Sequence, residues 1–246
     1  MSILRNHPFA VEAFFESSLV FTFAISKEHL QDLIPHCLEL DTFNDHWAFV
    51  AIAMVQTKDL RPKGFPKQLG NDFFLIGYRI FVRFTNKAGK KLRGLYILKS
   101  ETNSKKMEVL GNLFTNYQYT TTDISRVHKN DTLEISSAKS GFHVVIETKS
   151  KENIEMPDAT PFYDWKEARR YAGPLPFTFS FNPMTNKVLI IEGVRKHWKP
   201  EPVRVIDYSF SFPEKLDSKD FRLACAFIVK NIPYTWKKGK VESLSV

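Results

Sequence analysis

The sequence has few cysteines and no long apolar run. Only Cys37 and Cys225 occur among its 246 residues, and neither lies in a CxxC or CxxH spacing. A disulfide-rich scaffold and a cysteine-based zinc site are therefore excluded, and two reduced thiols in a cytoplasmic protein are expected. The first residues contain no apolar signal core, and no run reaches about 18 apolar residues, so we expect neither a signal peptide nor a membrane-spanning helix.

The sequence also lacks the short motifs that mark common active sites. It contains no GxxxxGK[ST], GxGxxG or GxSxG segment, which leaves nucleotide binding and serine hydrolysis without motif support. None of its seven histidines lies in an HxH or HExxH spacing, so we expect no metal and no cofactor. Cys37 adjoins His36, but neighbours in a strand point to opposite faces, which is a poor arrangement for a Cys-His pair.

Positive charge is in excess but scattered along the chain. The formal net charge is +8, with small basic clusters at 90–93, 105–106 and 237–240. Such an excess permits nucleic-acid binding without demonstrating it. The sequence has no RGG repeat, RNP motif, zinc finger or helix-turn-helix pattern. Nucleic acid is therefore not the expected partner, although a nucleic-acid or protein interaction module stays open as an alternative.

Aromatic residues are what the sequence has in abundance. They make up 14% of the chain, and phenylalanine alone occurs 22 times. Aromatic and β-branched residues suit the pleated, half-buried surfaces of sheets. The chain is long enough to bury a sizeable core and has no low-complexity segment, so we expect a single globular domain over residues 1–246.

Hydrophobic alternation and turn residues predict many strands and few helices. Strands are expected at 12–25, 38–40, 46–55, 73–84, 90–99, 117–124, 132–137, 142–148, 177–181, 188–194, 203–212 and 223–230. Short helices are expected at 27–34, at 104–114 with Ser104 as N-cap, and at 160–171 with Thr160 as cap. Because a sheet of this length must hide its edges, we predict an α+β fold built on a large curled antiparallel β-barrel or cone with about three short helices.

Polar residues on otherwise apolar strands are the candidates for a functional site. They interrupt or follow the strands around the middle helix: Arg79, Lys99, Glu101, Asn116, Tyr117 and Tyr119. A charged residue inside a buried strand has to be paired or face a cavity. Each candidate also has an ordinary structural interpretation. Arg79 would face outward, Lys99 and Glu101 would form a surface pair, and the tyrosines would lie in the core or at its rim.

Several short segments resemble a known family. They are 38–43 (LELDTF), 47–50 (WAFV), 61–66 (RPKGFP), 94–100 (GLYILKS), 173–177 (GPLPF) and 197–200 (HWKP). Together with the order of strands and helices, they are similar to the YqjF-like bacterial family of unknown function, in the acetoacetate decarboxylase-like superfamily. The resemblance covers most of the chain. It implies a cone-like antiparallel barrel with few helices and an internal apolar cavity.

The same resemblance implies that one catalytic group is missing. Decarboxylases of this superfamily carry a lysine soon after the middle helix, which forms a Schiff base with a β-keto acid. The corresponding position here holds Tyr119 or Thr120, and no lysine lies between residues 106 and 129. The superfamily's cavity glutamate corresponds to a position near Leu75, and its first-strand arginine to one near Glu16. The chain is therefore not expected to be an acetoacetate decarboxylase.

The leading hypothesis is that the chain binds a small, partly apolar molecule in the cavity. The ligand would be an anion if an arginine or lysine contacts it there. The expected site residues are Arg79 or Lys99 for the anion, Asn116, Tyr117 and Tyr119 for hydrogen bonds, and Trp47 and Phe81 as apolar walls. An alternative is an enzyme acting on a carbonyl-containing molecule, with Glu101 or a tyrosine as acid or base and Lys99 as the electrophilic or imine-forming group. Assembly into a homo-oligomer stays open.

Overall fold

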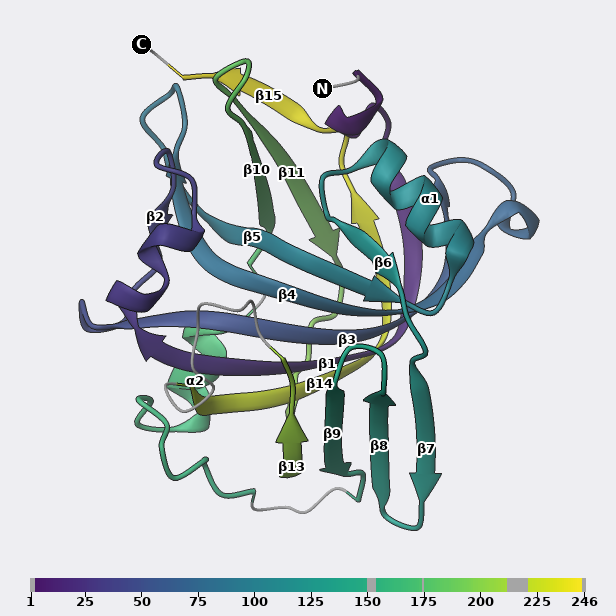
Figure 1. The fold of residues 1–246 in the computed structure, drawn as a ribbon, viewed down its shortest axis with the longest axis vertical. Helices are drawn as coiled ribbons and strands as arrows, with labels where there is room; N and C mark the ends of the chain where they lie inside the picture. Colours follow the sequence, from purple (N-terminus) through teal and green to yellow (C-terminus); the bar gives the residue numbers. More distant parts are fainter. Residues whose placement is uncertain (1–2, 150–153, 174, 212–220, 245–246) are drawn as a thin grey trace.

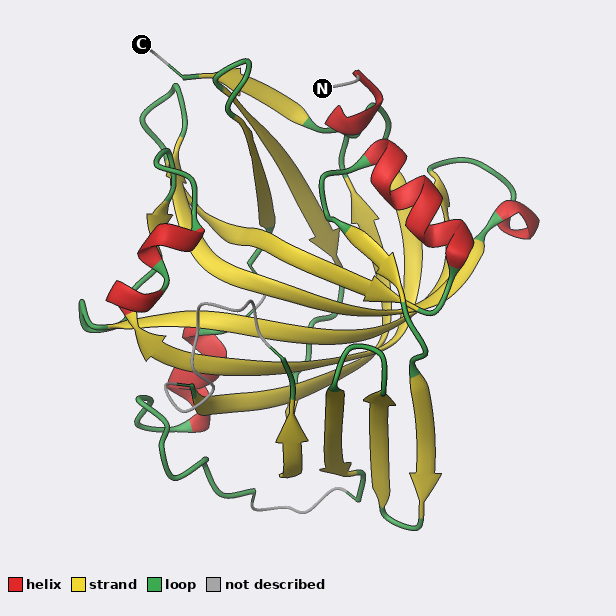
Figure 2. Ribbon diagram, viewed as in Figure 1, coloured by secondary structure: helices red, strands yellow, loops and turns green. Residues whose placement is uncertain are grey.

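A computed structural model of the chain describes residues 3–149, 154–173, 175–211 and 221–244 (Figures 1 and 2). Its strands are β1 (Val11–Ser26), β2 (Glu39–Leu40), β3 (Trp47–Pro62), β4 (Asn71–Thr85), β5 (Lys91–Thr102), β6 (Tyr119–Thr121), β7 (Ser125–Lys129), β8 (Thr132–Ser137), β9 (Phe142–Glu147), β10 (Phe177–Asn182), β11 (Lys187–Arg195), β12 (Glu201–Pro202), β13 (Val205–Ser209), β14 (Arg222–Trp236) and β15 (Lys240–Ser243). The α-helices are α1 (Lys105–Phe114) and α2 (Trp165–Tyr171), and the 3-10 turns are η1 (Ile3–Asn6), η2 (Lys27–His29), η3 (Gln31–Leu33) and η4 (Lys67–Leu69). No helix among the described residues is long and apolar enough to cross a membrane.

One 11-stranded sheet dominates the described part of the chain (Figure 2). Its main path runs β12-β14-β1-β3-β4-β5-β10-β11-β15, with β2 beside β4 and β6 beside β5. The sheet curls until β11 also pairs with β14, which sets Arg195 opposite Tyr234. Most neighbouring strands are antiparallel, but β5 pairs in parallel with β6 and with β10. The predicted α+β fold with a large curled sheet is confirmed, and the sheet is mixed rather than wholly antiparallel.

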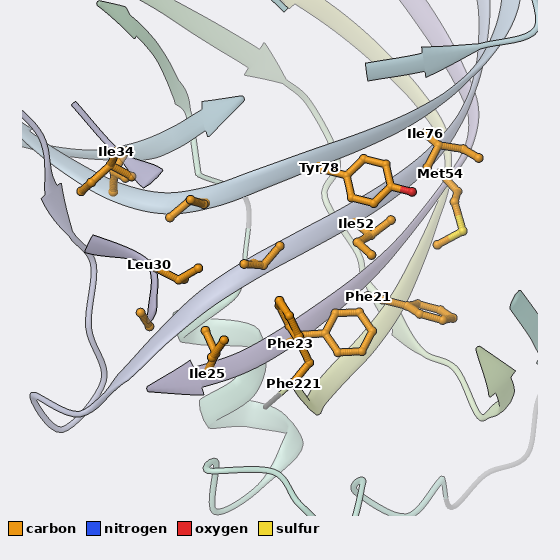
Figure 3. Close-up of a cluster of buried hydrophobic side chains, with 14 of the residues drawn as sticks. Phe21, Phe23, Ile25, Leu30, Ile34, Ile52, Met54, Ile76, Tyr78 and Phe221 are labelled. Atoms are coloured by element: carbon orange, nitrogen blue, oxygen red, sulfur yellow. The ribbon is translucent and has the colours of Figure 1, made fainter. Parts of the chain in front are cut away.

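A second, four-stranded sheet covers one face of the large sheet. Its strands follow the order β13-β9-β8-β7 and lie below β1 and β14 in the view of Figure 1. Ile135 and Phe142 of this sheet pack into one apolar core with Phe21, Ile76 and Tyr78 of the large sheet. Figure 3 shows the side chains of this core gathered beside β1, β3 and β4. The opposite face of the large sheet packs against α1 and α2 through two smaller apolar clusters.

The two faces of β4 have different surroundings because side chains alternate along a strand. Ile76 and Tyr78 point into the core shared with the second sheet. Leu75, Arg79 and Phe81 point to the other face, where a cavity lies. The strand therefore separates a dry apolar core from a space that receives a charged side chain.

A β-bulge between β4 and β5 shifts the alternation of β5. Tyr78 lies opposite Lys99, whereas the next residue of β4, Arg79, lies opposite Ile97, so Leu98 is the extra residue. An extra residue turns every side chain beyond it to the other face of the sheet. Ile97 therefore shares the cavity face with Arg79, and Lys99 shares the opposite face with Tyr78.

α1 begins where the sequence predicts it. The Ser104 Oγ accepts a hydrogen bond from the backbone N of Met107 at 3.2 Å, as an N-cap does. Met107 is buried on the inner side of the helix. One turn later, Gly111 lets the ring of Tyr119 rest on the helix backbone, because a Cβ at this position would lie only 2.3 Å from a ring carbon of Tyr119. The helix is thereby fixed directly above β6.

α2 starts later than the sequence predicts. Asp164 caps it and accepts from the backbone N of Glu167 at 2.7 Å. Thr160, the expected cap, instead donates from its hydroxyl to the carbonyl oxygen of Ala224 at 2.7 Å. The same hydroxyl accepts from the backbone N of Phe162 at 3.2 Å, but no helix begins at this turn, and the predicted start at residue 160 is wrong.

Other predicted elements differ in extent, and the strands expected at 46–55 and 223–230 are lengthened to β3 and β14. The helix expected at 27–34 is present as the two 3-10 turns η2 and η3. The strand expected at 117–124 is shortened to β6, and the strand expected at 203–212 is shortened to β13. Phe212, the last residue of the strand expected at 203–212, lies outside the described residues.

Candidate functional site

The face of the large sheet that carries α1 and α2 borders a partly open cavity of about 390 Å³. Strands β1, β3, β4, β5 and β14 and helix α1 contribute most of its lining. The walls are largely apolar and include Phe15, Phe73, Phe81, Met107 and Phe227. Sites for small organic molecules are clefts or cavities of roughly this size, mostly apolar with a few polar groups.

Arg79 is the charged side chain that β4 turns into this cavity. Its Nε is buried and has no hydrogen-bond partner. Burial lowers the pKa of Arg79, and the side chains close enough to act on its charge are the phenols of Tyr117, Tyr119 and Tyr234. Arginine nevertheless keeps its proton in proteins, since its ordinary pKa is about 12 or higher. Arg79 is therefore a partly buried cation whose buried Nε lies among neutral hydroxyl groups.

Arg195 is a second cation of the cavity and comes from the end of β11. Its Cζ lies 4.6 Å from the centroid of the Trp198 ring and 5.7 Å from that of Tyr234. Burial lowers the pKa of Arg195, and the positive charge of Arg79 lowers it further. Within the described residues, no carboxylate acts on the charge of either arginine. The two guanidinium groups thus line the same cavity and have no acidic partner.

Three tyrosines surround these arginines as neutral hydroxyl groups. Burial raises the pKa of Tyr117 and Tyr234, and it raises the pKa of Tyr119 to about 12, although Arg79 opposes the shift. At neutral pH each phenol therefore keeps its proton and can donate a hydrogen bond. The Tyr234 hydroxyl is seated over Gly193, where a Cβ would lie 1.9 Å from the oxygen.

The cavity contains an unusual number of unsatisfied polar atoms. Buried atoms without a hydrogen-bond partner occur on four of its lining side chains: His7 Nδ1, Arg79 Nε, the Tyr117 hydroxyl and Trp198 Nε1. Native proteins contain only a few such atoms, and each calls for an explanation such as a bound water, ion or ligand. Their concentration on one cavity identifies it as the best candidate for a functional site.

The structure brings together four of the residues that the sequence nominates. Arg79 and Phe81 from β4 line the cavity together with Tyr117 and Tyr119, which follow α1. The rings of the two tyrosines are 6.3 Å apart. Of the two positions that resemblance offers for the Schiff-base lysine, Tyr119 borders the cavity and Thr120 is exposed.

The other four nominated residues lie elsewhere. Lys99 and Glu101 face away from the cavity as a consequence of the bulge, and Lys99 Nζ donates to Glu101 Oε1 at 2.9 Å. Asn116 lines a smaller pocket and donates from Nδ2 to the carbonyl oxygen of Arg5 at 3.4 Å. Trp47 stands at the start of β3 with the guanidinium of Arg222 at 5.0 Å from its ring.

Among the cavity residues that the sequence did not predict are four with polar side-chain atoms: His7, Arg195, Trp198 and Tyr234. Arg195 and Tyr234 meet because β11 and β14 pair across the closure of the sheet, a contact between distant parts of the chain. Trp198 lies in the 197–200 segment that carries part of the resemblance. The resemblance of that segment was the one sequence signal that pointed to Trp198. It does not reveal that the Trp198 ring packs against Arg195.

The side chains of the cavity limit its chemistry. Among the described lining residues there are no lysines, aspartates or glutamates, and the cations are arginines. An arginine cannot act as an imine-forming amine, because the guanidinium stays protonated. Of the two positions carried over from the superfamily's acidic and basic residues, Leu75 lines the cavity and Glu16 is exposed. In the described part of the chain, no group of three or more His, Cys, Asp or Glu side chains could hold a metal ion.

Comparison with known proteins identifies one matching family. The family model of DUF2071, described as "Uncharacterized conserved protein (COG2071)", matches residues 13–241 of the chain. The comparison with curated proteins found no match.

Solved structures with a similar fold have low sequence identity to the chain. The acetoacetate decarboxylase from Legionella pneumophila aligns with a TM-score of 0.64 at 12% identity, covering 96% of this chain and 88% of the other. An acetoacetate decarboxylase-like enzyme from Sphingomonas wittichii RW1 aligns with a TM-score of 0.59 at 10% identity, covering 98% and 95%. The enduracididine biosynthesis enzyme MppR complexed with pyruvate also aligns with a TM-score of 0.59 at 10% identity, covering 95% and 90%. The chain therefore has the acetoacetate decarboxylase-like fold.

Proposed function

The chain belongs to the DUF2071 family of uncharacterized conserved proteins, and we propose that it binds a small, partly apolar organic anion in its cavity. The observation that carries this proposal is Arg79, a partly buried cation with a buried, unsatisfied Nε and no acidic partner among the described residues. A buried charge without a partner is strongly unfavourable, so such a residue is retained where an anion is bound.

The surroundings of Arg79 supply the other features of an anion site. Tyr117, Tyr119 and Tyr234 keep their protons and can donate to an oxyanion. A guanidinium also matches a planar carboxylate, because both present two parallel hydrogen-bonding positions. The apolar walls leave room for a short hydrocarbon or aromatic group attached to the anion.

The structural relatives support an organic anion as the ligand class. One of them, MppR, is complexed with pyruvate, a small organic anion. Another, the acetoacetate decarboxylase from Legionella pneumophila, is named for acetoacetate, which is also a small organic anion. Binding, rather than decarboxylation through an imine, is proposed for this chain because an imine needs a primary amine, and the described lining provides none.

Calorimetric titration with benzoate tests the proposal. The wild-type protein is expected to bind benzoate, and Arg79→Met is expected to weaken binding by about tenfold to a hundredfold, the range of a lost charge-assisted hydrogen-bond pair. Arg170→Met is the matched control, since it removes the same charge from an exposed position in α2 that does not line the cavity. Equal affinities of Arg79→Met and wild type, or no binding of benzoate and pyruvate to the wild type, would refute the proposal.

A further inference from the structure

Four arginines line the cavity. Arg61 is paired with Glu12 and Arg169 is exposed, so the partly buried cations without an acidic partner are Arg79 and Arg195. Arg79 comes from β4 and Arg195 from β11, and each is surrounded by aromatic rings rather than by carboxylates. The positive charges of Arg79 and Arg195 both act to lower the pKa of Tyr234, against the larger effect of burial. Tyr234 therefore lies near both arginines. A ligand with a single negative charge leaves one of these guanidinium groups uncompensated.

We propose that the cavity selects a dianion, whose compact head group places one negative charge against Arg79 and the other against Arg195. The chemical class is a phosphoryl or phosphonate group, or a pair of carboxylates on one carbon, attached to a short apolar body. This inference rests on the proposed function and specifies its ligand.

Electrostatics favour a dianion here more than they would at a surface. Two like charges in a low-dielectric environment repel strongly, and the surrounding phenols are neutral and supply no compensating charge. A dianion converts that repulsion into two attractions, whereas a monoanion removes only part of it. Guanidinium groups also suit phosphoryl oxygens, because they donate pairs of parallel hydrogen bonds.

The second arginine is held in position from the protein side. The guanidinium of Arg195 contacts the ring of Trp198 and, at a longer distance, the ring of Tyr234. The Tyr234 hydroxyl in turn lies over Gly193. These aromatic contacts fix Arg195 without neutralising it, since they leave its hydrogen-bond donors available. A purely structural arginine would be expected to have a carboxylate or carbonyl partner, whereas the contacts of the Arg195 guanidinium are the rings of Trp198 and Tyr234.

Charge-matched probes with the same phenyl body test the inference. Benzenesulfonate carries one charge, whereas phenylphosphonate and phenylmalonate carry two at about pH 8. Calorimetric titration of the wild-type protein at low ionic strength is expected to show binding of one or both dianions about tenfold or more tighter than benzenesulfonate. The dianion that binds more tightly distinguishes a phosphoryl-type head group from a dicarboxylate.

The variant Arg195→Met, with Arg170→Met as control, connects the preference to its residue. In Arg195→Met the dianion preference is expected to fall to about twofold or less while benzenesulfonate still binds, because Arg79 remains. Equal wild-type affinities for the three probes would overturn the dianion inference and leave the proposed anion site standing. Failure of all three probes, with benzoate and pyruvate, would overturn both, and a preference that persists in a folded Arg195→Met would overturn the role of Arg195.

Discussion

Two clusters of arginines on the same curled sheet differ in whether a carboxylate of the chain lies between the guanidinium groups. In the first, the fully buried carboxylate of Asp41 accepts from Arg83 Nε at 2.5 Å and from Arg93 Nε at 2.6 Å. In the second, Arg79 and Arg195 share a cavity without a carboxylate. The paired cluster ties β4 and β5 to the segment after β2, whereas the unpaired one leaves its charge available for a ligand.

The comparison is close because two of these arginines belong to one strand. Arg79 and Arg83 are four residues apart on β4 and, by alternation, point to the same face. Arg83 lies directly opposite Arg93, a like-charge arrangement that would be unfavourable without Asp41. The same residue type on the same face is therefore structural where the chain supplies a carboxylate, and available for binding where it does not.

Replacement of Asp41, the carboxylate that bridges Arg83 and Arg93, is expected to have the largest effect on stability. Asp41→Asn leaves Arg83 and Arg93 facing each other, and should lower the free energy of unfolding by about 3 kcal/mol, the low end of the range for a broken buried pair, because both arginines are partly exposed. Urea denaturation measures this change. Asp45→Asn, which breaks an exposed pair with Lys27, is the control and should cost less than about 1 kcal/mol.

The unpaired cluster should respond in the opposite direction. Without ligand, Arg79→Met replaces a partly buried cation with an unsatisfied Nε by an apolar side chain of similar length, and the protein should not lose stability and should gain about 1 kcal/mol. The same urea titration in a buffer without organic anions checks this. A loss comparable to that of Asp41→Asn would mean that Arg79 has a structural partner, and the contrast between the clusters would then be wrong.

Two buried tyrosines extend the contrast to single hydroxyl groups. The Tyr171 hydroxyl donates to the carbonyl oxygen of Asp41 at 2.9 Å, whereas the Tyr117 hydroxyl makes no hydrogen bond of standard geometry and has the side chain of Thr178 close by. Tyr171→Phe should therefore lower stability by about 1 kcal/mol, and Tyr117→Phe should leave stability unchanged while weakening anion binding about fivefold. Thermal unfolding and benzoate titration of both variants measure the two effects. If the two variants lose equal stability, the Tyr117 hydroxyl is already satisfied inside the protein.

Alternation and capping rules predicted the part of this arrangement that is local in the chain. Period-two alternation over 73–84 puts Arg79 and Phe81 on one face, and both line the cavity. The Ser104 cap and the apolar spacing behind it locate α1 and, with it, the tyrosines that follow. The curled sheet itself followed from strand number and the need to hide edges.

The part that could not be predicted depends on register and on long-range pairing. One extra residue, Leu98, sends Lys99 away from the cavity, and no residue type in that segment signals a bulge. Arg195 reaches the cavity only because β11 pairs with β14, from parts of the chain about forty residues apart. Asp41 likewise pairs with arginines on two other strands, β4 and β5. Neither cluster can therefore be recognised from residues that are neighbours in the sequence.

The smallest expected effect is that of pH on binding, because the unpaired cluster does not titrate near neutrality. Between about pH 7 and pH 9 the arginines stay charged, His7 is neutral since burial lowers its pKa, and Tyr119 keeps its proton because its pKa is raised to about 12. The affinity for benzenesulfonate, whose own charge is constant, should therefore change less than about twofold over this interval. Calorimetric titrations at several pH values in constant salt measure it.

The same phenols predict where this constancy ends. Tyr119 has a folded-state pKa above the unfolded value of about 10, so its contribution to stability is complete below about pH 10 and is lost as the pH rises toward 12. Unfolding free energy should fall in that alkaline interval, and less steeply in Tyr119→Phe. A tenfold change in benzenesulfonate affinity between about pH 7 and pH 9 would instead reveal a titrating group at the anion, which the guanidinium pair does not contain.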